Sequence, residues 1–217
     1  MTRLVRSLSA ALLLVSLTAC VTMQPRDYSA YRANKPRSIL VLPPVSNAPD
    51  VNASVSMLSV ATLPLAEAGY YVIPVAPAFQ TFRQNGITVA NDAHDIPADR
   101  LRDIFGADAA LYVTVEKYGT VYQVISSNTT VSANAKLVDL RTGTLLWEGT
   151  ALASSAESQG NGGGLIGMLV AAAVNQVLSS VTDEGHRIAN VTSLRLLSAG
   201  VPNGLLYGPY NPKYGTD

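Results

Sequence analysis

Cys20 is the residue of this 217-residue chain whose chemistry is most informative, because it is the only cysteine. A single cysteine forms no internal disulfide and cannot build a cysteine-based zinc cluster. Its thiol is instead a nucleophile that can be alkylated to a thioether. Two small residues, Thr18 and Ala19, directly precede it and would give a peptidase access to the bond before Cys20.

The segment before Cys20 has the layout of an export signal. Arg3 and Arg6 make its start positive, and an almost wholly apolar run over residues 10–17 follows. This run is typical of a signal peptide and is too short to cross a bilayer, which takes about 20 apolar residues. The end of the segment, Leu17-Thr18-Ala19-Cys20, resembles the lipobox of bacterial lipoproteins. The resemblance implies that Cys20 is acylated and becomes the first residue of the mature chain.

The same resemblance implies a location for the protein. In such lipoproteins an aspartate after the cysteine commonly signals retention in the inner membrane, so Val21 implies transfer to the outer membrane. Several acyl chains such as palmitate, at about 0.8 kcal/mol per buried methylene, anchor a protein stably. We therefore expect a lipid-anchored outer-membrane protein on the periplasmic face. The alternative is an ordinary secretory signal with a chance cysteine.

The two histidines are the other candidates for chemistry, and neither has a convincing set of neighbours. His94 follows Asp92 in a polar stretch, where the two could share a metal, but a solvated loop of turn-forming residues is favoured. His186 lies three residues after Asp183, so on a helix the two share a face and favour a surface pair over a catalytic dyad. Neither histidine has the His-Glu-x-x-His context of a metalloprotease.

Other sequence signals of catalysis or cofactor binding are weak. The glycine cluster 160–164 is followed by Leu165-Ile166, where a phosphate-binding loop would carry Lys-Ser/Thr, so we interpret it as a connection. Lys+Arg and Asp+Glu both total 15, which leaves no basic surplus for nucleic acid. The sequence therefore predicts no catalytic, cofactor-binding or metal-binding residue, and no nucleic-acid partner.

The elements that would position these residues form one mixed α/β domain. Residues 131–137 alternate apolar and polar side chains, which predicts a sheet with one face in water. Arg141 to Gly143 predict the turn of a hairpin between this strand and the next. The predicted strands are 38–42, 70–74, 109–118, 120–126, 129–140 and 145–156, and the predicted helices are 54–68, 76–84, 98–105 and 165–190.

The ends of the chain lack apolar periodicity, which sets the expected domain limits. We expect a lipoprotein signal peptide over 1–19, a flexible tether over 20–37 and a single α/β domain over 38–198. Residues 199–217, rich in glycine, proline and tyrosine, are expected to form an extended tail that packs across the domain. The apolar stretch 165–178 is favoured as a buried helix, and the alternative is a contact surface for a second subunit.

Several segments together resemble a known family. The opening Ile39-Leu40-Val41-Leu42-Pro43-Pro44 and the hairpin 137–147 resemble the TolB amino-terminal-type domain, and the hairpin is also similar to curli-secretion-type lipoproteins. With the stretches 105–112 and 206–210, the chain resembles a Gram-negative lipoprotein family of unknown function. The resemblance implies an α/β (α+β) fold in which a mixed, mostly antiparallel sheet has helices packed on one face.

Two classes of function follow from these observations. The first is a non-enzymatic accessory or scaffold of an envelope complex of transport or secretion type, with other envelope proteins, or a second copy, as partners. The alternative is a periplasmic hydrolase whose active site the sequence does not reveal. A deep pocket that holds His94 or His186 with carboxylates would favour the enzyme, and a shallow surface would favour the partner-binding protein.

Overall fold

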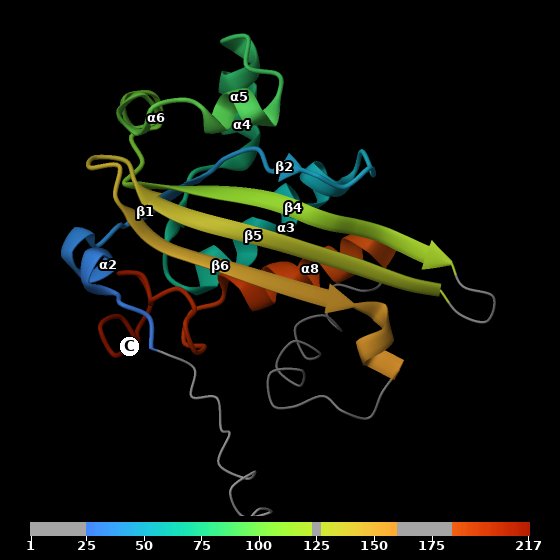
Figure 1. Ribbon diagram of the computed structural model, residues 1–217. Coiled ribbons are helices and arrows are strands. Elements are labelled where there is room, and N and C mark those ends of the chain that lie inside the picture. Colours follow the sequence, from blue (N-terminus) through green and yellow to red (C-terminus); the bar gives the residue numbers. More distant parts are fainter. Residues whose placement is uncertain (1–24, 123–126, 160–183) are drawn as a thin grey trace, which may run out of the picture.

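One six-stranded mixed sheet organises the computed structural model, which describes residues 25–122, 127–159 and 184–217 (Figure 1). The strand order is β3-β1-β4-β5-β6, and β2 pairs with β4 beside this path. Strand β1 is parallel to β3 and β4, whereas β4, β5 and β6 form an antiparallel meander. The strands are β1 (Ser38–Val41), β2 (Val45–Ser46), β3 (Tyr71–Val72), β4 (Ala109–Tyr122), β5 (Ser127–Asp139) and β6 (Leu145–Ser154).

The meander confirms the predicted period of two. Val131, Ala133, Ala135 and Leu137 of β5 are all buried, while the residues between them are half-buried or exposed. The segments 109–118 and 120–126 are expected as two strands, but 109–122 form the single strand β4, and residues 123–126 lie outside the described residues. Pairing with β5 runs without interruption through Gly119, where a break is expected, and a register shift lies earlier, between Val115 and Lys117.

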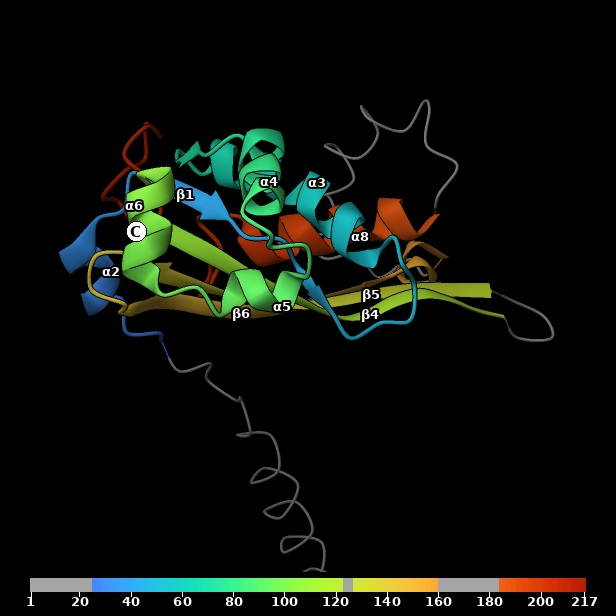
Figure 2. The same cartoon turned by 90° about the horizontal axis from the view of Figure 1, so that it is seen from above.

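Helices α3 (Ala53–Glu67) and α8 (Glu184–Leu197) pack side by side over one face of the sheet (Figure 2). Met57, Ala61 and Leu65 recur every fourth residue of α3 and are completely buried, so they lie on the one face of the helix that contacts the sheet. The predicted helix 165–190 lies largely outside the described residues, but its Ile188 is buried in α8 as expected. The predicted mixed, mostly antiparallel sheet with helices is thereby confirmed.

Three short helices, α4 (Val75–Gln84), α5 (Ala90–His94) and α6 (Ala98–Phe105), form a second core. Ile39 and Val41 of β1 point into the core under α3, so Leu40 and Leu42 point to the opposite face. All four side chains are buried, which requires helices on that face too. The expectation is that helices cover one face of the sheet. This holds for α3 and α8, but at the parallel end of the sheet helices also pack against the opposite face.

Both ends of the described chain pack against the domain. Helix α2 (Ser29–Asn34) lies within the expected tether, and its Tyr31 belongs to the core under α3. Leu205 and Leu206 of the tail belong to the same core. The packed region of the structure thus reaches beyond residues 38–198 on both sides, and Figure 1 shows α2 beside the C-terminal segment. The 3-10 helix η2 (Ser155–Gln159) follows β6, and Glu157 pairs there with Arg195 of α8.

Candidate functional site

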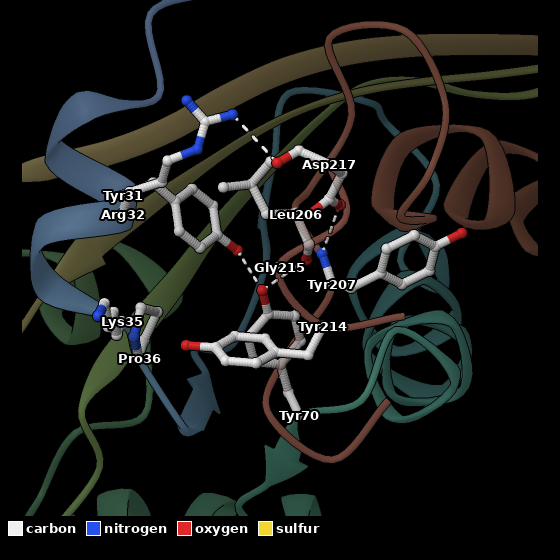
Figure 3. Close-up of a pocket in the computed structure, with 10 residues that line it drawn as sticks. All are labelled: Tyr31, Arg32, Lys35, Pro36, Tyr70, Leu206, Tyr207, Tyr214, Gly215 and Asp217. Atoms are coloured by element: carbon white, nitrogen blue, oxygen red, sulfur yellow. Dashed lines mark hydrogen bonds between the residues drawn. The ribbon is translucent and has the colours of Figure 1, made fainter. Parts of the chain in front are cut away.

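A cavity of about 420 Å³ lies where α2 meets the C-terminal segment (Figure 3). We call it the tyrosine pocket. Its four tyrosines come from three segments that are far apart in the sequence: Tyr31 from α2, Tyr70 from the position before β3, and Tyr207 and Tyr214 from the tail. The lining residues are Tyr31, Arg32, Lys35, Pro36, Tyr70, Leu206, Tyr207, Tyr214, Gly215 and Asp217.

A chain of hydroxyl groups forms the floor of this pocket. The Tyr70 hydroxyl donates to the carbonyl of Leu206 at 2.6 Å, so its oxygen accepts a hydrogen bond from the Tyr31 hydroxyl at 2.7 Å. Tyr31 and Tyr70 are only 3% and 5% exposed. This burial raises the pKa of both hydroxyls above the ordinary value, so both stay protonated at neutral pH. The floor is therefore uncharged and held in place by its own hydrogen bonds.

Main-chain hydrogen bonds attach the tail to the residues that directly follow α3. The Gly208 N–H donates to the Ala68 carbonyl at 2.8 Å, and the Tyr210 N–H donates to the Gly69 carbonyl at 3.0 Å. Gly69 has φ +94°, and a Cβ at this position would overlap Asn211. Only glycine allows the tail to approach the end of α3 so closely. This contact positions Tyr214 and Asp217 at the pocket.

Charged groups surround the mouth of the tyrosine pocket. The Arg32 guanidinium donates to the main-chain oxygen of Asp217 at 3.1 Å, and the Asp217 carboxylate accepts from the Tyr207 N–H at 2.7 Å. Lys35, at the end of α2, has φ +46° and an exposed side chain. Its ammonium forms no hydrogen bond or ion pair with the described residues. In Figure 3 the ring of Tyr207 points away from Tyr31 and Tyr70.

His94 lines a second, separate cavity of about 350 Å³ on the β4–β5 surface. The sequence predicts a solvated loop here, but His94 is the last residue of α5 and is half-buried. Its Nε2–H donates to the Pro43 carbonyl at 3.0 Å, and its ring meets the Tyr112 ring edge-on, with centroids 5.2 Å apart. Burial lowers the pKa of His94, which favours the neutral imidazole. These contacts describe a packed histidine rather than a solvated one.

Asp92, the other half of the predicted His94 pair, is exposed on α5. Over residues 25–122, 127–159 and 184–217, the structure has no cluster of three His, Cys, Asp or Glu side chains that could hold a metal. The two residues thus offer at most an incomplete ligand set within this part of the chain.

His186 has a partner that the sequence does not reveal. Its Nδ1 lies 2.6 Å from the Ser56 hydroxyl oxygen, which also accepts a hydrogen bond from the Tyr118 hydroxyl at 3.0 Å. Ser56 is on α3, Tyr118 on β4 and His186 on α8, so the three link the two helices to the sheet. Asp183, the predicted surface partner of His186, lies outside the described residues.

The lipidation candidate, Cys20, also lies outside the described residues. In the part of the chain that the structure does describe, no helix is long and apolar enough to span a membrane. The tyrosine pocket was not predicted from the sequence, although Tyr207 and Tyr214 in the tail were the visible signal for it.

Comparisons with known proteins identify the family. A family model described as "Putative lipoprotein GNA1162-like" matches residues 26–210. The "Putative lipoprotein NMB1124/NMB1162" of Neisseria meningitidis serogroup B is 46% identical over 197 residues, which cover 90% of this chain and 91% of that protein. The crystal structure of lipoprotein GNA1162 from Neisseria meningitidis has 50% identity and a TM-score of 0.54, covering 67% of this chain and 100% of that one.

These similarities confirm the expected lipoprotein resemblance. Both relatives are named as lipoproteins, and neither name states an enzymatic activity. The matched residues include α2, the whole described sheet and the tail as far as Tyr210, so Tyr214, Gly215 and Asp217 of the tyrosine pocket lie beyond the match. The chain therefore belongs to the family of GNA1162-like lipoproteins.

Proposed function

We propose that this lipoprotein is a non-enzymatic accessory or scaffold of an envelope complex of transport or secretion type. It is held on the periplasmic face of the outer membrane by acyl chains on Cys20, and residues 1–19 are removed as a signal peptide. The observation that supports the anchor is the lone cysteine, which follows a positively charged start and an apolar run in a chain of this family. The residues between Cys20 and Tyr28 reach at most about 30 Å, so the domain stays close to the membrane.

Mass spectrometry of the mature amino terminus tests the anchor. The wild-type chain is expected to begin at a Cys20 that carries acyl chains. Cys20→Ser should not be lipidated, and its precursor should not be cut by the lipoprotein peptidase. An unmodified Cys20 thiol, or a mature start at another residue, would refute lipid anchoring.

Membrane fractionation tests the location separately. The wild-type protein should sediment with outer-membrane vesicles, because Val21 does not signal inner-membrane retention. Val21→Asp serves as the matched variant and should shift the protein to the inner membrane while lipidation at Cys20 persists. Wild-type protein in the inner-membrane fraction would contradict the outer-membrane location but not the lipid anchor.

Crosslinking in intact cells tests the accessory role. Other envelope proteins should be recovered with the wild-type protein after purification from solubilised membranes. The Cys20→Ser variant controls for contacts that form only after cell lysis. Recovery of the protein with no crosslinked envelope partner would contradict a role in a complex.

The Ser56–His186 hydrogen bond is the observation that favours the alternative, a periplasmic hydrolase. A serine paired with a histidine base is the arrangement of an activated nucleophile. However, Ser56 is only 6% exposed among the described residues, and it lines neither of the two cavities described above. Its bonds to His186 and Tyr118 fit a polar link between α3, α8 and β4 better.

Labelling with a fluorophosphonate probe separates the two functions. The wild-type protein should remain unlabelled, as should Ser56→Ala. Labelling of the wild-type protein that disappears in a folded Ser56→Ala variant would establish the hydrolase and overturn the non-enzymatic role. Loss of labelling in His186→Ala as well would identify the histidine as the base.

A further inference from the structure

The tyrosine pocket has the size of a site for one small molecule. Its volume of about 420 Å³ lies within the range of about 300–1,000 Å³ for ligand pockets. At roughly 30 Å³ for each water, it holds the equivalent of about 14 waters, which is ample room for a single-ring compound. The rigid floor made by Tyr31 and Tyr70 gives the site a preformed shape.

The walls of the pocket favour an apolar ligand body. Most of the lining surface is apolar and comes from tyrosine rings, Pro36 and Leu206. The hydroxyls of Tyr31 and Tyr70 already bond to one another and to the Leu206 carbonyl. A ligand rich in hydroxyl groups would leave its own polar groups unpaired against this floor, at a cost in affinity. A flat ring that packs against the aromatic side chains fits better.

The charge at the mouth favours an anionic group on that ligand. Three charged side chains line the pocket: Arg32 and Lys35 are positive and Asp217 is negative, which leaves one net positive charge. The Asp217 carboxylate accepts a hydrogen bond from the Tyr207 N–H. Arg32 uses one N–H on Asp217, which leaves further donors. Lys35 ends α2 in the left-handed conformation of a helix C-cap, with its main-chain N–H donating to the Tyr31 carbonyl at 3.0 Å, which fixes where its side chain starts.

We propose that the tyrosine pocket binds a small amphipathic carboxylate, with its apolar ring against Tyr31, Tyr70 and Tyr214 and its carboxylate at Lys35 and Arg32. The inference goes beyond the proposed scaffold role and does not depend on Cys20. The ligand class is that of aromatic carboxylates, and benzoate is its smallest probe. An acidic sugar shares the charge but not the apolar body.

Isothermal titration calorimetry on the full chain in neutral detergent micelles tests this site, with empty micelles as the blank. Benzoate should bind about tenfold or more tightly than benzyl alcohol, which lacks the charge, and than glucuronate, whose ring is polar. Lys35→Gln should weaken benzoate binding by about threefold to fivefold, since Lys35 is exposed and water screens its attraction for the carboxylate. The same variant should leave the weak binding of benzyl alcohol unchanged.

Arg100→Gln is the matched control, because Arg100 is an exposed cation on α6 that does not line the pocket. It should bind benzoate as the wild type does. The carboxylate proposal fails if wild-type protein binds no benzoate, or binds benzyl alcohol equally well. It also fails if Lys35→Gln behaves like Arg100→Gln, or if glucuronate binds more tightly than benzoate. Lys35 and Arg100 are both exposed, so neither substitution should disturb the fold. Melting curves that match the wild type will show that both variants are folded.

Discussion

At the scale of single residues, Tyr70 links three separate parts of the molecule. Its ring belongs to the core under α3, and its hydroxyl bonds both to Tyr31 of α2 and to the Leu206 carbonyl of the tail. The loss of the Tyr70 hydroxyl would therefore remove a hydrogen-bond partner from both the Tyr31 hydroxyl and the Leu206 carbonyl. The Tyr31 hydroxyl stands at the end of this chain of hydroxyls and donates its hydrogen bond to Tyr70.

Because the Tyr70 hydroxyl makes two hydrogen bonds and the Tyr31 hydroxyl makes one, the same substitution by phenylalanine should cost more stability at Tyr70 than at Tyr31. Tyr70→Phe removes two hydrogen bonds, one from the Tyr31 hydroxyl and one to the Leu206 carbonyl, so it should lower the free energy of unfolding by about 1–3 kcal/mol. Tyr31→Phe removes one hydrogen bond and leaves only an acceptor, so it should cost about 0.5–1.5 kcal/mol. Urea denaturation of the two variants measures the difference. Equal losses, or a larger loss for Tyr31→Phe, would contradict the order of donors along the chain.

His94 should make the stability depend on pH below neutrality. Burial lowers the pKa of its imidazole from the ordinary value of 6.5 in the folded state. The unfolded chain therefore binds the proton first, so the stability that neutral His94 provides is complete above pH 6.5 and is lost as the pH falls below it. His94→Gln should unfold with a smaller difference between pH 7 and pH 5 than the wild type. Identical pH dependence of the two proteins in denaturant titrations would exclude this contribution.

At the scale of elements, the β5–β6 hairpin depends on a turn that both the side chain and the main chain of Asp139 stabilise by hydrogen bonds. The Asp139 carboxylate accepts from the N–H groups of Arg141 and Thr142 at 3.0 and 2.8 Å. The Gly143 N–H donates to the Asp139 carbonyl at 2.9 Å, and Gly143 has φ +70°. The predicted turn with glycine in the left-handed region is thereby confirmed.

Backbone strain alone should determine how much a substitution of Gly143 costs in stability. Nothing lies within 4 Å of a Cβ placed there, so steric overlap adds no cost. Gly143→Val should lower stability by about 1–2 kcal/mol, because a β-branched residue resists the left-handed conformation. Gly143→Asn is the control and should cost less, since asparagine adopts this conformation more readily. Thermal melting compares the two, and a valine variant as stable as the asparagine variant would argue against strain.

At the scale of the whole molecule, the tail is a structural part of the domain. Leu205 is 1% exposed and belongs to the same core as α3 and α8. The Trp147 indole N–H of β6 donates to the Asn203 carbonyl at 3.0 Å, which ties the tail to the far edge of the sheet. The tail therefore helps to close the core as well as the tyrosine pocket.

Truncating one tail leucine should accordingly behave as a core substitution. Leu205→Ala should lower the free energy of unfolding by about 2–5 kcal/mol, because it opens a cavity in packed surroundings. Leu145→Ala, at a position that is 45% exposed on β6, is the matched control and should change stability by about 0.5 kcal/mol or less. Chemical denaturation of both variants tests this, and a loss at Leu205 no larger than at Leu145 would show that the tail is dispensable for the core.

The sequence by itself predicts what depends on near neighbours along the chain. Alternating side chains from Val131 to Leu137 indicate a half-buried strand, and Gly143 indicates the hairpin turn, because both patterns reflect local backbone geometry. The lipidation prediction at Cys20 is local too, since processing enzymes read a short segment. That prediction awaits its own test.

Tertiary structure alone decides the tyrosine pocket, the Ser56–His186 pair and the packing of both chain ends. Tyr70 and Leu206 are separated by 136 positions, and Ser56 and His186 by 130, so no periodic pattern connects them. Helix α2 has six residues, and Tyr31 is its only buried one, which is too little for an amphipathic signal. Its burial follows from the tail that covers it, and such contacts form only when the sheet brings distant segments together.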